Sequence, residues 1–500
     1  MDFITNFPLF TIVLSLFSGV LCFMLKAKAA KTYTVCFEIL LLTLNICILV
    51  YTLKTGTSFT YTMGEFPAPW GNEIRAGVLE AFIAVSFVII LLCSVLAGYR
   101  FVLIDMDDSK INLYYALINL LTAALMALIW TNDIFTGYVF LEILTLTSCG
   151  ILIVREIGRT TLAAVRYMIM NLLGSGLFLL GVVLLYDLTG HLLMVPMQET
   201  IRELSVDPHV IPVLTMSVAI LTIGLSIKSG LFPFHFWMPD TYGWATPTSA
   251  SILSSLTSKA YIFLLIKIYY RAIGFWVIEQ MPIQNILLVL GICGIIIGSF
   301  QAIRAHTINR MVAFSSAAQI GYIFMGIGLG GEAGYTAAIF HILAHAVTKS
   351  LLFLTTPRLA AVSGESLIFR KLQGSGLRDR LAGFAFLISA FSMIGIPIFA
   401  GFSSKIQFGL AAAGTHSGRT LVAVMLALAI SSMLNAVYFI RTIIRIYSTR
   451  DGAETEADTG RSKDFSFVFP MLVLTLANLF LGLFSGVAIG WIQTGLSMFS

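Results

Sequence analysis

Long stretches of apolar residues alternate with short polar segments along the whole chain. A helix needs about 20 apolar residues to cross the hydrocarbon core of a bilayer, and such stretches recur fourteen times. The expected helices cover residues 6–25, 33–53, 79–99, 111–130, 134–154, 164–187, 210–229, 249–270, 284–303, 311–330, 334–356, 382–411, 420–443 and 466–495. Membrane β-strands would show alternating segments of about 10 residues, a pattern that the chain lacks. The sequence therefore predicts an all-α, polytopic membrane protein.

The composition agrees with this pattern. Hydrophobic residues make up 58% and charged residues 11% of the chain, against about 25% charged in soluble domains, and the mean hydropathy is +0.93. The first helix has Asp2 in place of a basic N-terminal region and no small-residue cleavage site before Lys26. We therefore expect it to be retained rather than removed as a signal peptide.

Positive charge is distributed unevenly between the two sides of the membrane. Of the 30 lysines and arginines, twenty follow odd-numbered helices, five follow even-numbered helices and five lie inside helices. The positive-inside rule then places both termini on the non-cytoplasmic side of the cell membrane. The net charge of +5 is spread over short loops rather than gathered in one patch, so we expect the lipid bilayer, and no nucleic acid, as a partner.

The loops carry no motif for a cofactor or for catalysis. The longest cover residues 54–77, 188–209, 357–381 and 450–465, and none has a Walker, Rossmann or zinc signature. The six cysteines lie in or beside apolar helices without CxxC spacing, where they behave as small hydrophobes. We expect no cofactor, no metal site and no catalytic chemistry of the chain's own.

Six ionisable residues lie deep inside the apolar stretches. They are Glu142, Lys228, Lys259, Lys267, Lys349 and Lys405. A charged side chain at the bilayer centre costs roughly 2.5 to 3.5 kcal/mol on insertion scales, so such residues usually serve the movement of charge. The sequence thus indicates transport of an ion or a proton.

Lys228 stands beside an expected break in the helix over 210–229. Gly230 follows two residues later and Pro233 five residues later. Proline removes a backbone donor and clashes with the preceding turn, and free backbone at membrane depth must line a cavity or be buried in protein. A lysine beside a broken transmembrane helix is typical of transporters.

The same pattern returns before Lys405. The segment IGIPIFAGFSSK (394–405) aligns without a gap on IGLSIKSGL (223–231), so that Gly401 matches Gly230, and Pro397 marks the expected break. The two segments lie five helices apart and therefore cross the membrane in opposite senses. Inverted repeats with broken helices at corresponding positions are found in many transporters.

Two lysines share the helix expected over 249–270. Lys259 lies midway between the membrane faces, which favours a functional role, whereas Lys267 lies near the end of the helix. We expect the ammonium of Lys267 to reach the interface by snorkelling.

His341, His345 and Lys349 are spaced four residues apart, which places them in a stripe along one helix face. Histidine titrates near neutrality, so the stripe indicates a proton relay. Two alternatives remain open. The histidines could be a core pair satisfied by hydrogen bonds, or one could bind haem with partner histidines on another helix.

Glu142 is expected to ionise only beside a cation. The hypothesis pairs it with Lys228; the alternative is an isolated, protonated carboxyl group.

These residues stand in segments that resemble a known family. The segments are TNDIFTGYVFLEILTLTSCGIL, RYMIMNLLGSGLFLLGVVLLYDLTG, IKSGLFPFHFWMPDTYGWATPTSASILSS, INRMVAFSSAAQIGYI, HILAHAVTKSLLFL and GIPIFAGFSSK. In this order, over roughly residues 111–445, the chain resembles the antiporter-like subunits of respiratory complex I, Mrp-type sodium/proton antiporters and energy-converting membrane hydrogenases. Lys405 and the segments around GSGLFLLGVV and HAVTK favour the Mrp D or hydrogenase-linked branch.

The resemblance implies fourteen helices and two inverted five-helix repeats, each a proton half-channel. The implied parts are N-terminal helices (1–110), a first repeat (111–272), a second repeat (283–446) and a last helix (466–500). In this family Glu142 and Lys228 would form a glutamate–lysine pair. Lys259 would lead to a central relay of His341, His345 and Lys349, and Lys405 would end the second half.

The sequence therefore predicts a proton-translocating membrane subunit of a multisubunit ion-pumping complex. Its partners would be the other membrane subunits and H+, and the complex could carry Na+ as well. The alternative is a stand-alone secondary transporter for another cation or solute, or a structural scaffold, either of which would tolerate loss of these charges.

Overall fold

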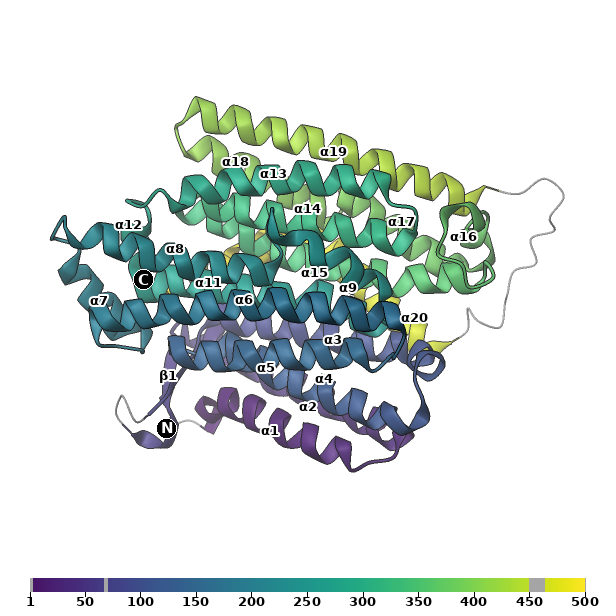
Figure 1. Ribbon diagram of the computed structural model, residues 1–500, viewed down its shortest axis with the longest axis horizontal. Helices are drawn as coiled ribbons and strands as arrows, with labels where there is room; N and C mark the ends of the chain where they lie inside the picture. Colours follow the sequence, from purple (N-terminus) through teal and green to yellow (C-terminus); the bar gives the residue numbers. More distant parts are fainter. Residues whose placement is uncertain (1–2, 67–70, 449–463, 500) are drawn as a thin grey trace.

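The computed structural model describes residues 3–66, 71–448 and 464–499. Its long helices run roughly parallel to one another, from α1 (Phe7–Phe23) at the bottom of Figure 1 to α19 (Gly418–Tyr447) at the top. Among the described residues, 13 continuous helical segments are long and apolar enough to cross a membrane. The prediction of an all-helical, polytopic membrane fold is confirmed.

The first part of the chain forms helices up to a long, partly π-helical segment. After η1 (Phe3–Asn6) and α1, the elements are α2 (Ala27–Thr55), β1 (Phe59–Thr62), η2 (Met63–Glu65), β2 (Glu73–Ala76), α3 (Val78–Asp105), α4 (Asp108–Trp130), α5 (Ile134–Ile153), α6 (Gly158–Thr189), α7 (Met194–Leu204), α8 (Val210–Ser229), η3 (Phe234–Trp237), α9 (Met238–Trp244), α10 (Pro247–Ile252), η4 (Leu253–Thr257), α11 (Ser258–Lys267), η5 (Ile268–Gly274) and α12 (Phe275–Ile278). The segments η4 and η5 are π-helical.

The second part is built the same way. Its elements are α13 (Ile283–Arg304), α14 (Ile308–Leu329), α15 (Gly331–Ala361), η6 (Phe369–Lys371), α16 (Ser375–Arg378), α17 (Arg380–Ile394), α18 (Ala400–Gly414), α19, α20 (Phe465–Leu483) and α21 (Ser485–Ser497).

The structure differs from the expected helices in three places. The helix expected over 382–411 consists of two 15-residue helices, α17 and α18, which explains 13 continuous spans where fourteen helices were expected. The last helix is divided at Phe484 into α20 and α21. Two loops also hold regular structure that hydropathy does not reveal.

The loop over 54–77 contains the antiparallel pair β1–β2, with Phe59 opposite Ala76. The loop over 188–209 contains α7, whose buried Met194, Met197 and Ile201 form one apolar side. Both elements are too short to register as spans, because their apolar residues cover only one face.

Closely packed small residues join neighbouring helices. A Cβ on Gly174 of α6 would lie 2.8 Å from the carbonyl oxygen of Gly224 on α8, and a Cβ on Gly321 of α14 would lie 2.6 Å from that of Gly291 on α13. Glycine allows such close contact between backbones inside a membrane. The most apolar 18 residues of α15 are completely buried, whereas 28% of the corresponding stretch of α19 is buried. Helix α15 is therefore central and α19 peripheral.

Candidate functional site

Lys228 and Glu142 are brought together from α8 and α5. The Lys228 side chain is fully buried, and its Nζ lies 3.9 Å from Oε1 of Glu142. The same ammonium donates a 2.6 Å hydrogen bond to Oγ1 of Thr145, one turn beyond Glu142, and lies 5.2 Å from the ring centre of Tyr261. The ion pair is therefore held at a distance by a hydroxyl group that can carry a proton between other groups.

Lys228 also occupies the last turn of a broken helix. Helix α8 ends at Ser229, and Gly230 takes a left-handed conformation with φ of 79°. Pro233 lies in the interruption before η3. The carbonyl end of a helix carries partial negative charge, which favours a cation there, so the break itself stabilises the ammonium.

The second break lies earlier than the sequence alignment placed it. Helix α17 ends at Ile394, Gly395 is left-handed with φ of 92°, and Pro397 lies in the interruption. Gly401, matched to Gly230 in the alignment, is instead in the first turn of α18. A Cβ at Gly401 would lie 1.8 Å from the carbonyl oxygen of Ser392, so this glycine is needed for close packing rather than for the turn.

Lys405 lies on α18 and covers the end of α17. Its Nζ donates to the Ile394 carbonyl at 2.5 Å and to Oγ of Ser432 on α19 at 2.7 Å. A terminal carbonyl of a helix has no partner within the helix. Lys228 and Lys405 thus share one physical device, an ammonium at the carbonyl end of an interrupted helix.

Lys259 lies directly after the π-helical segment η4 and is fully buried. Its ammonium donates to the Ser254 carbonyl and, at 3.1 Å, to Oγ of Ser258. π-Helical turns are frequent at functional sites. The side chain of Ser254 continues outward, with its Oγ 3.0 Å from Oγ of Ser316 on α14.

Lys349 meets the same stretch of α14 from α15. Its Nζ donates to the Val312 carbonyl at 2.9 Å and to Oγ of Ser315. Ser315 is the chain neighbour of Ser316, which contacts Ser254. Serine hydroxyl groups of α14 therefore lie between Lys259 and Lys349.

His345 and His341 extend this row along α15. Their rings stack with centroids 5.9 Å apart, and Nδ1 of His341 lies 2.7 Å from Oγ of Ser404, the neighbour of Lys405. Neither ring nitrogen of His345 has a hydrogen-bond partner among the described residues. This argues against a core pair satisfied by hydrogen bonds, because each lost bond is costly in a buried site.

A small cavity lies between the histidines and the second break. It has a volume of about 10 Å³, roughly the room that one water molecule needs. Its lining is Gln319, His341, Ala344, His345, Thr348, Ser392, Met393, Gly401 and Lys405. A water molecule there would face both the histidine stripe and the Lys405 side of the break.

Lys267 does not snorkel. Its side chain is fully buried, and Nζ donates to the carbonyl oxygens of Ile129 at 2.7 Å and Thr131 at 2.6 Å. These carbonyl groups lie at the end of α4, where helical partners are missing. The expectation was wrong because the surrounding helices cover the side chain and offer it acceptors in place of water.

Thr145, Ser315 and Ser432 each accept a hydrogen bond from a lysine of the site, and sequence reasoning did not select them. Thr145 could have been found from its place one turn after Glu142 on the same face. Hydroxyl residues are common in membrane helices, so no such signal marked the two serines.

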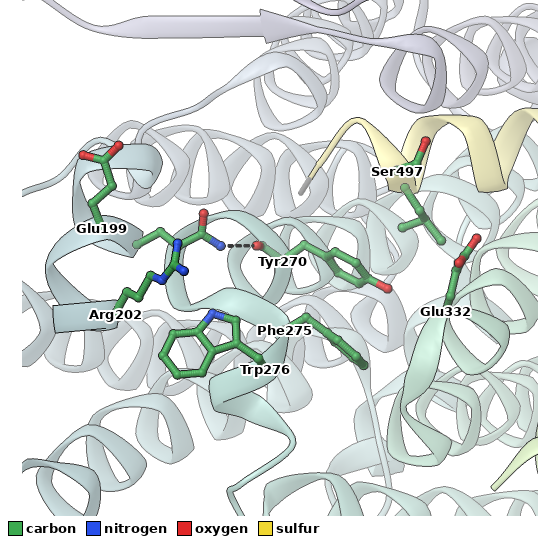
Figure 2. A pocket seen from close by; sticks show the side chains of 9 residues that line it. Glu199, Arg202, Tyr270, Phe275, Trp276, Glu332 and Ser497 are labelled. Carbon is green, nitrogen blue, oxygen red and sulfur yellow. Dashed lines mark hydrogen bonds between the residues drawn. The ribbon is translucent and has the colours of Figure 1, made fainter. Parts of the chain in front are cut away.

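A larger cavity of about 510 Å³ opens elsewhere, at one end of the helices. Figure 2 shows Tyr270, Phe275 and Trp276 between Arg202 and Glu199 on one side and Glu332 on the other. The predicted relay residues do not line this cavity.

The fold and site define a polytopic membrane protein with a buried row of lysines and histidines beside two interrupted helices. Residues 131–433 match the family model described as "NADH:quinone oxidoreductase/Mrp antiporter, TM". The chain belongs to this family, and the resemblance seen in the sequence is confirmed.

Relatives with two kinds of name cover most of the chain. NADH-quinone oxidoreductase subunit N of Desulforudis audaxviator is 33% identical, with 87% of each chain covered. The D-type subunit of the Na(+)/H(+) antiporter of Bacillus subtilis is 25% identical, covering 87% of this chain and 85% of that one. The higher identity to an oxidoreductase subunit of the N type does not single out the D branch that the sequence favoured.

Two solved structures share the fold. A chain of the Mrp complex from Dietzia sp. superimposes with a TM-score of 0.86, at 22% identity, over 99% of this chain and 97% of that one. A chain of the membrane-bound sulfane sulfur reductase, an archaeal respiratory membrane complex, gives 0.85, at 23% identity, over 99% and 96%.

Proposed function

We propose that this chain is the proton-translocating membrane subunit of a multisubunit ion-pumping complex. The observation that carries the proposal is the buried row itself. The side chains of Lys228, Lys259, Lys349 and His345 are at most 2% exposed, and each of the three lysines donates to a hydroxyl or carbonyl oxygen. Such residues inside a membrane are costly and mark ion paths or proton relays.

The first half of the path runs from Glu142 to the centre. When the Glu142 carboxylate moves away, Lys228 loses an anion 3.9 Å from its ammonium, and it then releases its proton more readily to Thr145 and onward. Thr145 lies 3.3 Å from the hydroxyl of Tyr261, on the same helix as Lys259. The two lysines titrate as a coupled pair because the charge on one changes the cost of charge on the other.

The second half runs along α15 to the second break. The serines of α14 join Lys259 to Lys349, the stacked histidines follow, and Ser404 leads to Lys405. We place the two inverted repeats at residues 111–272 and 283–446, one half-channel in each. The distribution of positive loop residues puts both termini on the non-cytoplasmic side of the cell membrane.

The parent complex supplies the energy and the other membrane subunits. Subunit names among the relatives support a quinone oxidoreductase or a sodium/proton antiporter as that complex. The second kind would move Na+ against H+.

The test compares proton movement by the intact complex with and without Lys228. The complex, purified through a tag on this chain, is reconstituted into vesicles that contain a pH-sensitive dye. We expect Lys228→Ala to abolish proton movement while all subunits still copurify. Lys54, an exposed residue at the end of α2, provides the control Lys54→Ala, which should pump normally. Unchanged pumping by Lys228→Ala would contradict the proposal.

A further inference from the structure

A second buried carboxyl group lies far along the chain from the relay, in the bundle of α1, α2 and α4. Glu38 on α2 is fully buried, although it was not among the membrane charges selected from the sequence. Its Oε1 accepts a 3.0 Å hydrogen bond from Oγ1 of Thr122 on α4. Among the described residues, Oε2 has no hydrogen-bond partner and no lysine or arginine pairs with the group.

Contacts between α1 and α4 fix the level of Ser18. Nε1 of Trp130 donates to Oγ1 of Thr11 at 3.1 Å, and a Cβ on Gly19 would lie 2.6 Å from Cγ of Leu120. The two helices therefore run antiparallel in direct contact. This register brings Ser18 to the level of residues 119–122 on α4.

Contacts between α2 and α4 fix the level of Glu38. Nδ2 of Asn119 donates to Oγ1 of Thr34 at 3.2 Å, while Thr122 donates to Glu38 one turn further on. Helices α2 and α4 thus run parallel in register. Ser18, Glu38, Asn119 and Thr122 consequently share one depth, within about one helical turn of 5.4 Å.

Three oxygens in this group have no hydrogen-bond partner among the described residues. They are Oγ of Ser18, Oε2 of Glu38 and Oδ1 of Asn119, on residues that are at most 1% exposed. A proton on Glu38 would give the carboxyl one donor and could satisfy one acceptor. A cation placed among the oxygens would satisfy all of them at once, which matters because an unpaired buried polar group costs about 1–3 kcal/mol.

We propose that Ser18, Glu38, Asn119 and Thr122 form a binding site for Na+. Carboxylate, amide and hydroxyl oxygens are the ligands of hard cations. The site has one carboxylate, so a monovalent ion leaves it neutral, whereas a divalent ion would leave a net charge in a dry environment, which is costly. All four residues precede residue 131, where the match to the family model begins, and none belongs to the proposed relay.

Equilibrium binding of radioactive Na+ to the purified complex tests the site. We expect Glu38→Gln to lose about one bound Na+ per copy of this chain, and Asn119→Leu to weaken binding. The control is Asn45→Leu, which removes a buried amide two turns further along α2 and should bind as the unmodified chain does. Equal Na+ binding by the unmodified chain and Glu38→Gln, or none by either, overturns the proposal.

A second measurement uses the unmodified chain, so it does not depend on the folding of a variant. A hydrophobic carbodiimide reacts with buried protonated carboxyl groups, and peptide mass spectrometry locates the product. We expect labelling of Glu38 in choline chloride to be slowed several-fold by NaCl. Equal labelling in the two salts, including none in either, means that the carboxyl group binds no Na+ and contradicts the proposal.

Discussion

The ion pair of Glu142 and Lys228 gives the relay its most quantitative prediction. Glu142→Gln removes the carboxylate charge but keeps the size of the side chain. At 3.9 Å between Nζ and Oε1, two unit charges attract by about 4 kcal/mol for an effective dielectric constant of 20. About 4 kcal/mol corresponds to roughly a thousand-fold in rate or occupancy. We therefore expect proton movement to fall to below about 1% if a proton on Lys228 is an obligatory step.

The assay follows the initial rate of acidification in vesicles that contain the intact complex. Glu142→Asp keeps the charge at about 5 Å, where the attraction is still about 3 kcal/mol, so this variant should retain much more transport than Glu142→Gln. The order Asp above Gln is the decisive result. Equal rates for the two variants, or a Gln variant that pumps normally, would refute the electrostatic role of Glu142.

Three further predictions follow from single contacts. Thr145→Val removes the 2.6 Å acceptor of Lys228 and should slow proton movement about five- to tenfold, from a lost hydrogen bond to a charged group worth about 1.5 kcal/mol or more; Thr147→Val, on the same helix but bonded only within it, should not, and equal rates would contradict the hydroxyl's role. Lys405→Ala should block proton movement while carbodiimide labelling of Glu142 stays unchanged, and normal pumping would remove Lys405 from the path. Asp379→Asn discharges the carboxylate that lies 2.7 Å from the Arg358 guanidinium and should destabilise the protein by about 3–5 kcal/mol, measured as a lower midpoint of thermal unfolding in detergent; an unchanged midpoint would show that the pair adds nothing to stability.

The helical spans and the residues of the relay could be predicted from local sequence. Hydropathy summed over about 20 residues identifies a span without knowledge of its neighbours, and a charge inside such a window stands out. Glu38 carries the same signal within the helix expected over 33–53, so it was detectable and was overlooked. The position of the second break was harder, because Gly395 and Gly401 both fit a glycine-rich interruption.

What the sequence by itself determined is the class of the protein and the list of groups that can carry charge, because both depend on residue type and spacing along one helix. Tertiary structure alone decided which oxygen each group faces. Lys267 meets carbonyl groups more than 130 residues away along the chain, Lys228 meets a threonine 83 residues away, and Lys405 meets the end of another helix. Polar partners inside a membrane protein come from helices packed side by side, and that packing depends on the shapes of many small residues at once.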